Sequence, residues 1–195
     1  MKKIMDRKRG RAGFTLAETL ITVLILLMVS GVVAAGIPSA ANALEKAVDG
    51  ANAQVLLSTT MTVLRDELAN ARMNTNDVES PISISDSKKI IYYTGGDGTQ
   101  MQIESKDYTN TGSDNGIFIT PRGGTERSLV SKEAATGNMF AVYDSIEYDK
   151  AAGVVTVKDL SVRKGNSVIV SVAEYKIRVI SYVPTPVPTS TQGGE

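Results

Sequence analysis

The chain has 195 residues, enough for one domain of ordinary size. It contains no cysteine and no histidine, which excludes disulfide bonds, Cys/His metal sites and catalytic arrangements built on either residue. The formal net charge of 0 is unevenly distributed: residues 1–13 carry six basic side chains and one acid, and the remainder carries 15 basic and 20 acidic ones. We therefore predict no catalytic residues, no metal, no cofactor, and no nucleic-acid contact by the acidic body.

A long apolar run follows the basic leader. Residues 14–37 make 24 positions, and a helix needs about 20 to cross a bilayer. Positive charge lies only on the N-terminal side, which predicts a single pass through the cytoplasmic membrane with the N-terminus inside and the body outside. Glu18 lies within this run, where an isolated carboxylate costs about 2.5–3.5 kcal/mol. Such a residue is expected to have a partner and a function.

The motif Gly-Phe-Thr-Leu-Ala-Glu over residues 13–18 resembles the prepilin signature of type IV pilins and pseudopilins. The resemblance is confined to about the first 40 residues. It implies cleavage after Gly13 by a prepilin peptidase, N-methylation of the new N-terminus at Phe14, and assembly with other pilin subunits. The carboxylate of Glu18 would pair with the Phe14 amine of a neighbouring subunit. The expected function is a structural subunit of a pilus or pseudopilus, at the cell surface.

Other interpretations remain open. A secretory signal peptide would end near the small residues 41–43 (Ala-Asn-Ala), although its apolar region is usually only about 7–15 residues long. A plain signal anchor explains the length and the charges but not Glu18. The corresponding functions are a membrane-anchored extracellular binding module that does not polymerise, and a secreted hydrolase.

The apolar run is predicted to begin one helix that extends from Phe14 to Arg72. Gly31, Gly36 and Pro38 predict a kink or a locally loosened helix between Ser30 and Pro38, because proline removes a backbone hydrogen bond. The alternative is a pair of ordinary membrane-helix glycines followed by a stop near the interface. Residues 14–38 would form the transmembrane or filament-core half, and residues 39–73 an amphipathic spine.

The predicted spine carries two apolar stripes at helical spacing. The first contains Leu44, Val48, Ala51 and Val55, and the second contains Leu57, Met61, Leu64, Leu68 and Ala71. The shift between them predicts that different faces of the helix are buried along its length. A coiled-coil dimer is the alternative.

Residues 74–182 are predicted to form a β-rich head, an antiparallel sheet packed on the spine, so that the fold class is α+β and pilin-like. Short strands are expected at 82–85, 88–94, 99–104, 117–120 and 127–130, with a hairpin turn at 95–98 (Gly-Gly-Asp-Gly). The last three strands are expected at 139–147, 154–163 and 168–181. A three-residue turn at 164–166 would place Val162 opposite Val168, with a change of buried face along both strands.

Two remaining segments are polar. The loop 105–116 contains Asp107, Asn110, Asp114 and Asn115, which could bind calcium through oxygen, although the spacing is not that of an EF-hand and a solvated loop is the simpler interpretation. The tail, residues 183–195, alternates proline with threonine and valine and is predicted to be extended or disordered.

Overall fold

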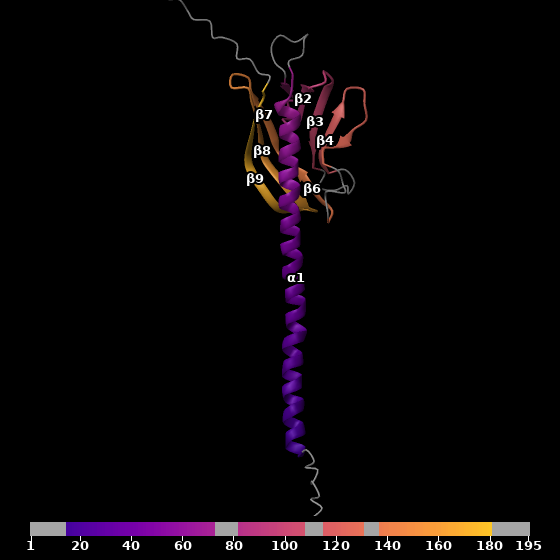
Figure 1. Ribbon diagram of the computed structural model, residues 1–195, viewed down its shortest axis with the longest axis vertical. Helices are drawn as coiled ribbons and strands as arrows, with labels where there is room; N and C mark the ends of the chain where they lie inside the picture. The colour runs from indigo at the N-terminus through magenta and orange to yellow at the C-terminus, as the bar shows by residue number, and fades with distance from the viewer. Residues whose placement is uncertain (1–14, 73–81, 108–114, 131–136, 181–195) are drawn as a thin grey trace, which may run out of the picture. The chain divides into compact units, whose positions relative to one another are not determined.

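The computed structural model describes residues 15–72, 82–107, 115–130 and 137–180. The fold is α+β: one long apolar helix near the N-terminus and two antiparallel sheets (Figure 1). The chain divides into two units, Met1–Ala47 and Val48–Glu195. The leader at 1–13 and the tail at 183–195 lie outside the described residues.

The one helix of the described residues, α1, runs from Leu16 to Ala69 and has 54 residues. It confirms the prediction of one continuous helix, and its ends lie within three residues of the predicted ones. Pro38 lies inside α1, and the helix continues on both sides of it. The proline is therefore no helix stop, and a bend at this position stays a prediction.

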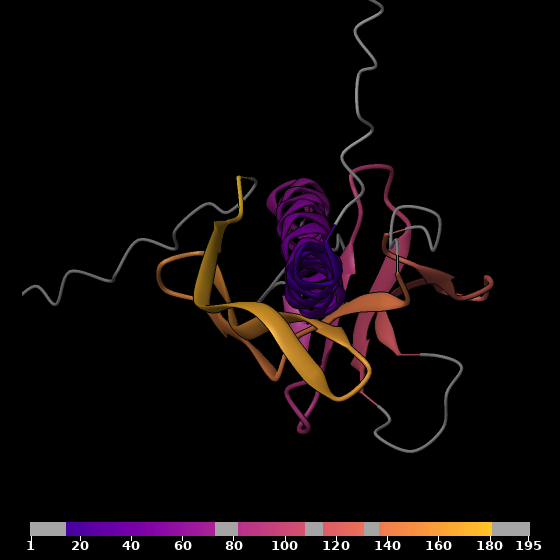
Figure 2. The same cartoon turned by 90° about the horizontal axis from the view of Figure 1, so that it is seen from below.

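The second apolar stripe of α1 forms the core of the head. Leu57, Leu64 and Leu68 are buried there, together with Ala71 just beyond the helix. The first stripe behaves differently from the prediction, because the side chain of Val55 is 62% exposed and the other three members are exposed as well. Only one face of the helix is covered by the sheets, which lie around this part of α1 in Figure 2.

The first sheet has five antiparallel strands in sequence order. They are β1 (Ile82–Ile84), β2 (Ile90–Thr94), β3 (Gln100–Lys106), β4 (Gly116–Pro121) and β5 (Arg127–Ser128). The turn between β2 and β3 confirms the predicted hairpin, and Asp97 holds it through hydrogen bonds from the Thr99 amide (2.9 Å) and hydroxyl (3.0 Å). The backbone amide bond is the main reason why the pKa of Asp97 lies below its usual value.

The second sheet contains β6 (Met139–Val142), β7 (Ser145–Asp149), β8 (Val154–Lys164) and β9 (Ser167–Arg178). β6 and β7 lie on the same edge of β8 with the same register, because Val142 pairs with Ser161 and Ser145 with Lys158. The strand predicted at 139–147 is therefore present but interrupted at residues 143–144.

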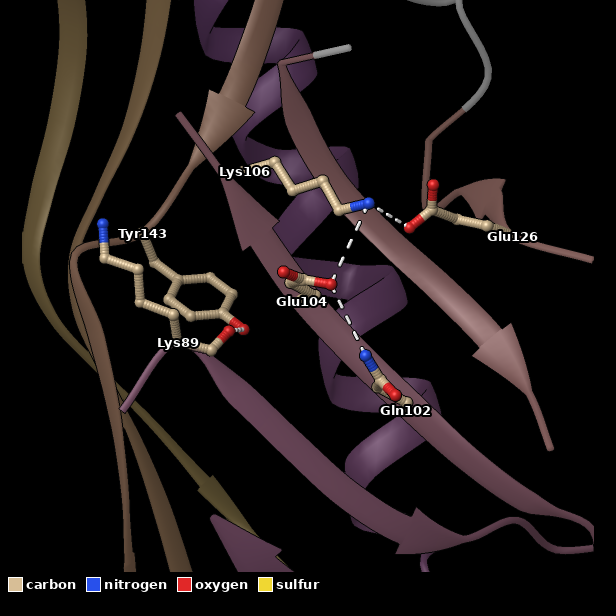
Figure 3. A network of polar contacts seen from close by, with 6 residues as sticks. All are labelled: Lys89, Gln102, Glu104, Lys106, Glu126 and Tyr143. Atoms are coloured by element: carbon tan, nitrogen blue, oxygen red, sulfur yellow. Dashed lines mark hydrogen bonds and ion pairs between the residues drawn. The ribbon is translucent and has the colours of Figure 1, made fainter. Parts of the chain in front are cut away.

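A buried serine explains this interruption. The Ser105 hydroxyl on β3 donates to the carbonyl of Tyr143 (2.9 Å) and accepts from its amide (3.0 Å). The Tyr143 hydroxyl reaches the carbonyl of Lys89 (2.8 Å). Figure 3 shows this tyrosine beside Lys89 and near the pairs that Lys106 forms with Glu126 and, at 3.9 Å, with Glu104. The backbone at residue 143 leaves the second sheet because it bonds to the first.

Replacing Ser105 by alanine is expected to lower the free energy of unfolding by about 1–3 kcal/mol, the usual cost of leaving buried polar groups unpaired. The amide and the carbonyl of Tyr143 would both lose their partner. Urea unfolding of the full chain in detergent, followed by tyrosine fluorescence, measures this loss. The same change at exposed Ser171 on β9 should alter stability by less than about 0.5 kcal/mol. Equal effects of the two changes would contradict the proposed joint between the sheets.

The register of the last hairpin differs from the prediction by two residues. Val162 pairs with Val170 rather than with Val168, because the turn has two residues, Gly165 (φ 59°) and Asn166, and a bulge follows in β9. A glycine with positive φ at the first turn position is favoured in two-residue hairpins. A shift of two residues keeps each side chain on its predicted face, although Val168 at the start of β9 is 51% exposed.

The predicted change of buried face is confirmed in β8. Val155 and Val157 are buried on one alternation phase, and Leu160 and Val162 on the other. The switch occurs at Asp159, which has a φ of 51° and is skipped in the pairing with β9, as is its counterpart at residue 173.

The C-terminal end of α1 is bonded to both sheets. The amide of Arg72 donates to the carbonyl of Thr94 at the end of β2 (2.8 Å). The amide of Ile180, just after β9, donates to the carbonyl of Ala69 (2.8 Å). The second bond satisfies a carbonyl of the last helical turn, which has no intrahelical partner.

Candidate functional site

The first turn of α1 contains the predicted functional carboxylate. Oε2 of Glu18 accepts hydrogen bonds from the amide and from the hydroxyl of Thr15, both at 3.2 Å. The Thr15 hydroxyl in turn accepts from the amide of Glu18 (3.3 Å). Among the residues that the structure describes, none forms an ion pair with Glu18. The carboxylate is thus oriented by the chain but has no cation beside it in this part of the molecule.

This arrangement is a capping box, a threonine followed three residues later by a glutamate. The two side chains satisfy amides of the first helical turn, which have no intrahelical partner. Such a cap contributes about 0.5–2 kcal/mol, and a negative charge at this end is favourable. The cap was not predicted, although the pattern Thr15-x-x-Glu18 is visible in the sequence. Glu18 therefore has a role within its own chain.

The other polar side chains of the apolar segment are satisfied by the helix itself. The hydroxyl of Thr19 donates to the carbonyl of Leu16 (2.8 Å), that of Ser30 to Leu26 (2.7 Å), and that of Thr22 to the carbonyl of Glu18. A hydroxyl bonded in this way needs no water. The segment can therefore enter an apolar environment without leaving these groups unpaired.

The N-terminal part of α1 presents large apolar side chains outward. Leucine, isoleucine and valine between residues 16 and 37 are at least half exposed, for example Leu20 at 63% and Leu27 at 63%. The helix is long and apolar enough to cross a membrane, and it is the one such helix among the described residues. This supports a single-pass membrane anchor and leaves its orientation as a prediction.

The predicted processing site, Gly13 and Phe14, lies outside the described residues. Gly31 and Gly36 lie within α1, and a methyl group added to either would meet no atom within 4 Å. Nothing in the described chain therefore requires a glycine at these two positions. This openness is compatible with close approach of another helix.

A concave surface on the first sheet is a second candidate site. Its lining includes Tyr92, Met101, Gln102, Arg122 and Lys150. The ring of Tyr92 is 42% exposed, and Gln100 orients Arg122 by accepting a hydrogen bond from its guanidinium group. An exposed aromatic ring, amides and cations can bind a polar or anionic ligand. This surface was not predicted from the sequence, because its residues come from separate strands.

Two carboxylates of the head, those of Asp107 and Glu147, form ion pairs. Asp107 accepts from Arg163 (2.7 Å), and Glu147 lies between Lys88 (3.1 Å) and Lys158 (2.8 Å). Hydrogen bonds from Lys158 and then from Lys88 lower the pKa of Glu147. The described residues contain no group of three carboxylates arranged for a metal. Asn110 and Asp114 of the polar loop 105–116 lie outside them, so calcium binding by this loop is untested.

Comparison of the chain with protein-family models, with characterised proteins and with solved structures found no match.

Proposed function

We propose that this chain is a type IV pilin-like subunit, cleaved after Gly13 and assembled into a filament through the N-terminal half of α1. The proposal depends above all on one feature: Glu18 is the single charged residue between Thr15 and Asn42 of an otherwise apolar helix. The compact head on the second half of α1, with one helix face left exposed, is consistent with it. Prepilin peptidase, other pilin subunits and the membrane are the proposed partners.

Burial of charge in an apolar filament core is the physical basis for the proposed role of Glu18. Cleavage after Gly13 would create an α-amino cation at Phe14, next to the apolar segment. A carboxylate on a neighbouring subunit would reduce the cost of placing both charges in an apolar filament core. Because Oε2 of Glu18 faces Thr15 while no described residue donates to Oε1, the carboxylate can keep its cap and accept a neighbour's amine at the same time.

Two substitutions separate the charge of Glu18 from its cap. Glu18→Gln removes the charge but keeps the capping pattern, since glutamine also serves in a capping box. Thr15→Ala removes the cap and keeps the charge, with an expected loss of about 0.5–2 kcal/mol in helix stability. We expect Glu18→Gln to abolish filaments sheared from cells, and Thr15→Ala to retain them. The N-terminal peptide of the wild-type chain is expected to begin at methylated Phe14 by mass spectrometry.

The opposite pattern would remove the proposed role of Glu18. If Glu18→Gln assembles and Thr15→Ala does not, the carboxylate acts as a helix cap alone. A chain whose N-terminal peptide begins at Met1 would be a signal-anchored protein, and one beginning at Leu44 a secreted protein.

The second candidate function is a membrane-anchored binding module that does not polymerise. The capping box favours it, because it explains Glu18 without any neighbour. The concave surface beside Tyr92 would then be its ligand site. Screening the full chain in detergent against anionic glycans and acidic peptides, with Tyr92→Ala and Arg122→Ala as variants, tests this function. Loss of binding in both variants, with no filaments from the wild type, would favour the module.

A further inference from the structure

The second sheet ends in a long strand with an open edge. β9 (Ser167–Arg178, 12 residues) pairs with β8, and no other described strand pairs with it. It is the outermost strand of this sheet in Figure 1. The next backbone bonds along the chain are those of Val179 to Gly153 and Ile180 to Ala69, beyond the strand end. The outer backbone groups of β9 therefore lack a partner strand within the described residues.

The first half of this strand has few of the features that protect an open edge. Residues 167–173 read Ser-Val-Ile-Val-Ser-Val-Ala, without charge or proline. Val168 is 51% exposed and Ile169 is 36% exposed. Proteins usually guard such edges with charges, prolines or bulges, because an unguarded edge pairs with another strand. β9 has a bulge near its start, and its charges, Glu174, Lys176 and Arg178, lie in its second half.

The tail of the chain has the sequence pattern of a strand that can pair on one side only. Prolines occupy residues 184, 186 and 188, and the alternate positions 183, 185, 187 and 189 are valine or threonine. Successive amides of an extended strand point to opposite edges. All three prolines therefore remove donors from one edge, while the β-branched residues keep theirs on the other. Proline also restricts itself and the preceding residue to extended conformations.

We propose that residues 183–189 of one copy add as a last strand to the open edge of β9 in a neighbouring copy. The pairing edge of the tail would complete the sheet, and its proline edge would prevent further strands from joining, as prolines do on natural edge strands. Both segments are uncharged over the paired length, so no like charges are brought together. The proposal rests on the proposed function, because assembly is what brings neighbouring copies together.

The distance along the chain favours a neighbouring copy over the same one. If residues 179–182 formed a turn and the tail folded back on its own β9, residue 183 would lie beside Arg178 and residue 189 beside Val172. The proline-alternating segment would then cover the charged half of β9. Its apolar start, with Val168 and Ile169, would stay uncovered. Pairing between copies has no such restriction of register.

Cross-linking in a chain without native cysteine tests the proposal directly. Copies with Ser171→Cys, an exposed position on β9, are co-expressed with copies that carry cysteine at residue 185, 187 or 189. A short bismaleimide tolerates an offset in register. Full-length chains are treated both in membranes and in sheared filaments, and cross-linked peptides are identified by mass spectrometry. We expect a product that joins β9 of one copy to the tail of another.

Two controls make the result specific. Exchanging two residues, Thr185→Pro with Pro186→Thr, keeps the composition but places a proline on the pairing edge, and should reduce the product to background. Ser83→Cys, an exposed position on the edge strand β1 of the first sheet, should give no product with the tail. A product at Ser83 in place of Ser171 would overturn the assignment to β9. A product insensitive to the exchange would overturn strand pairing.

The outcome is separable from that of the proposed function. Filaments that form and are lost in Glu18→Gln, but give no product between residue 171 and the tail, would sustain the proposed function and overturn this one. A chain with both cysteines that yields only an intrachain product would show that the tail covers its own β9, which also overturns pairing between copies. If no filaments form but the cross-link between residue 171 and the tail appears in membranes, tail pairing would be supported and the proposed filament function would be contradicted.

Discussion

Replacing Leu64 by alanine is expected to lower the free energy of unfolding of the head by about 2–5 kcal/mol, the usual range for a buried leucine. Leu64 is fully buried (0% exposed) and lies where α1 packs on the sheets. Truncation removes apolar contacts on the helix and leaves a cavity that the surrounding strands can fill only in part. Because domains of this size are marginally stable, a loss of this size would unfold a large fraction of the chains on mild heating.

The matched control is Leu44→Ala, the same change on the same helix at a side chain that is 66% exposed. It should alter the stability of the head by less than about 0.5 kcal/mol. All seven tyrosines lie beyond residue 91, so tyrosine fluorescence during urea unfolding reports on the head alone. Comparable midpoints for Leu64→Ala and wild type would mean that α1 does not form the core of the head.

Local patterns predicted the elements of the head well. The helix, the Gly-Gly-Asp-Gly hairpin and the buried positions of β8 follow from spacing and turn residues, which act over a few neighbours along the chain. The predicted register of β8 and β9 was wrong, because a shorter turn and a bulge together shift the pairing by two residues. Such a shift leaves each hydrophobic pattern unchanged, so the pattern cannot reveal it.

Contacts between distant segments were not predictable in the same way. The hydroxyl of Ser105 breaks a strand 38 residues away by bonding to Tyr143, and nothing near either residue in the sequence indicates this. The exposure of the first apolar stripe also depends on distant segments of the chain. The sequence shows that Val48 and Val55 could be buried, whereas the extent of the sheets decides that they are not. In a filament, this stripe would be available to another subunit.

The candidate site was predicted in part. The apolar helix was predicted, and the structure places Glu18 in its first turn. The bond between Glu18 and Thr15 was not predicted, because a helix start at Phe14 places Thr15 inside the helix and not at its N-cap. Helix capping uses Oε2 of Glu18, and the proposed pairing with a neighbouring amine would use Oε1. The two roles are therefore compatible, and the cap provides the control variant Thr15→Ala.

The head is also expected to lose stability steeply above pH 10. At that pH two tyrosines keep their proton in the folded head, where they are buried, but lose it in the unfolded chain. Burial raises the pKa of Tyr93, and the nearby charge of Glu67 raises it further. The Glu67 carboxylate accepts a hydrogen bond from the Tyr93 hydroxyl (2.8 Å). Burial, followed by the charge of Glu104, raises the pKa of Tyr143. A phenol with a raised pKa in the folded state contributes stability that is fully present below its ordinary pKa of 10.0 and declines above it.

The expected slope is about 1.4 kcal/mol of unfolding free energy per pH unit for each tyrosine, up to the pKa of the folded state. Urea unfolding at a series of pH values above 10 measures this slope, and the ultraviolet absorbance of tyrosinate shows that both phenols are neutral in the folded head.

Tyr93→Phe and Tyr143→Phe should each remove the contribution of one tyrosine to the slope, and the double variant should remove both contributions. The loss of the hydrogen bond to Lys89 in Tyr143→Phe lowers stability at every pH, so slope and offset are separable. A slope that is the same in the double variant and in wild type would assign the alkaline instability to lysines, whose ordinary pKa is close to that of tyrosine.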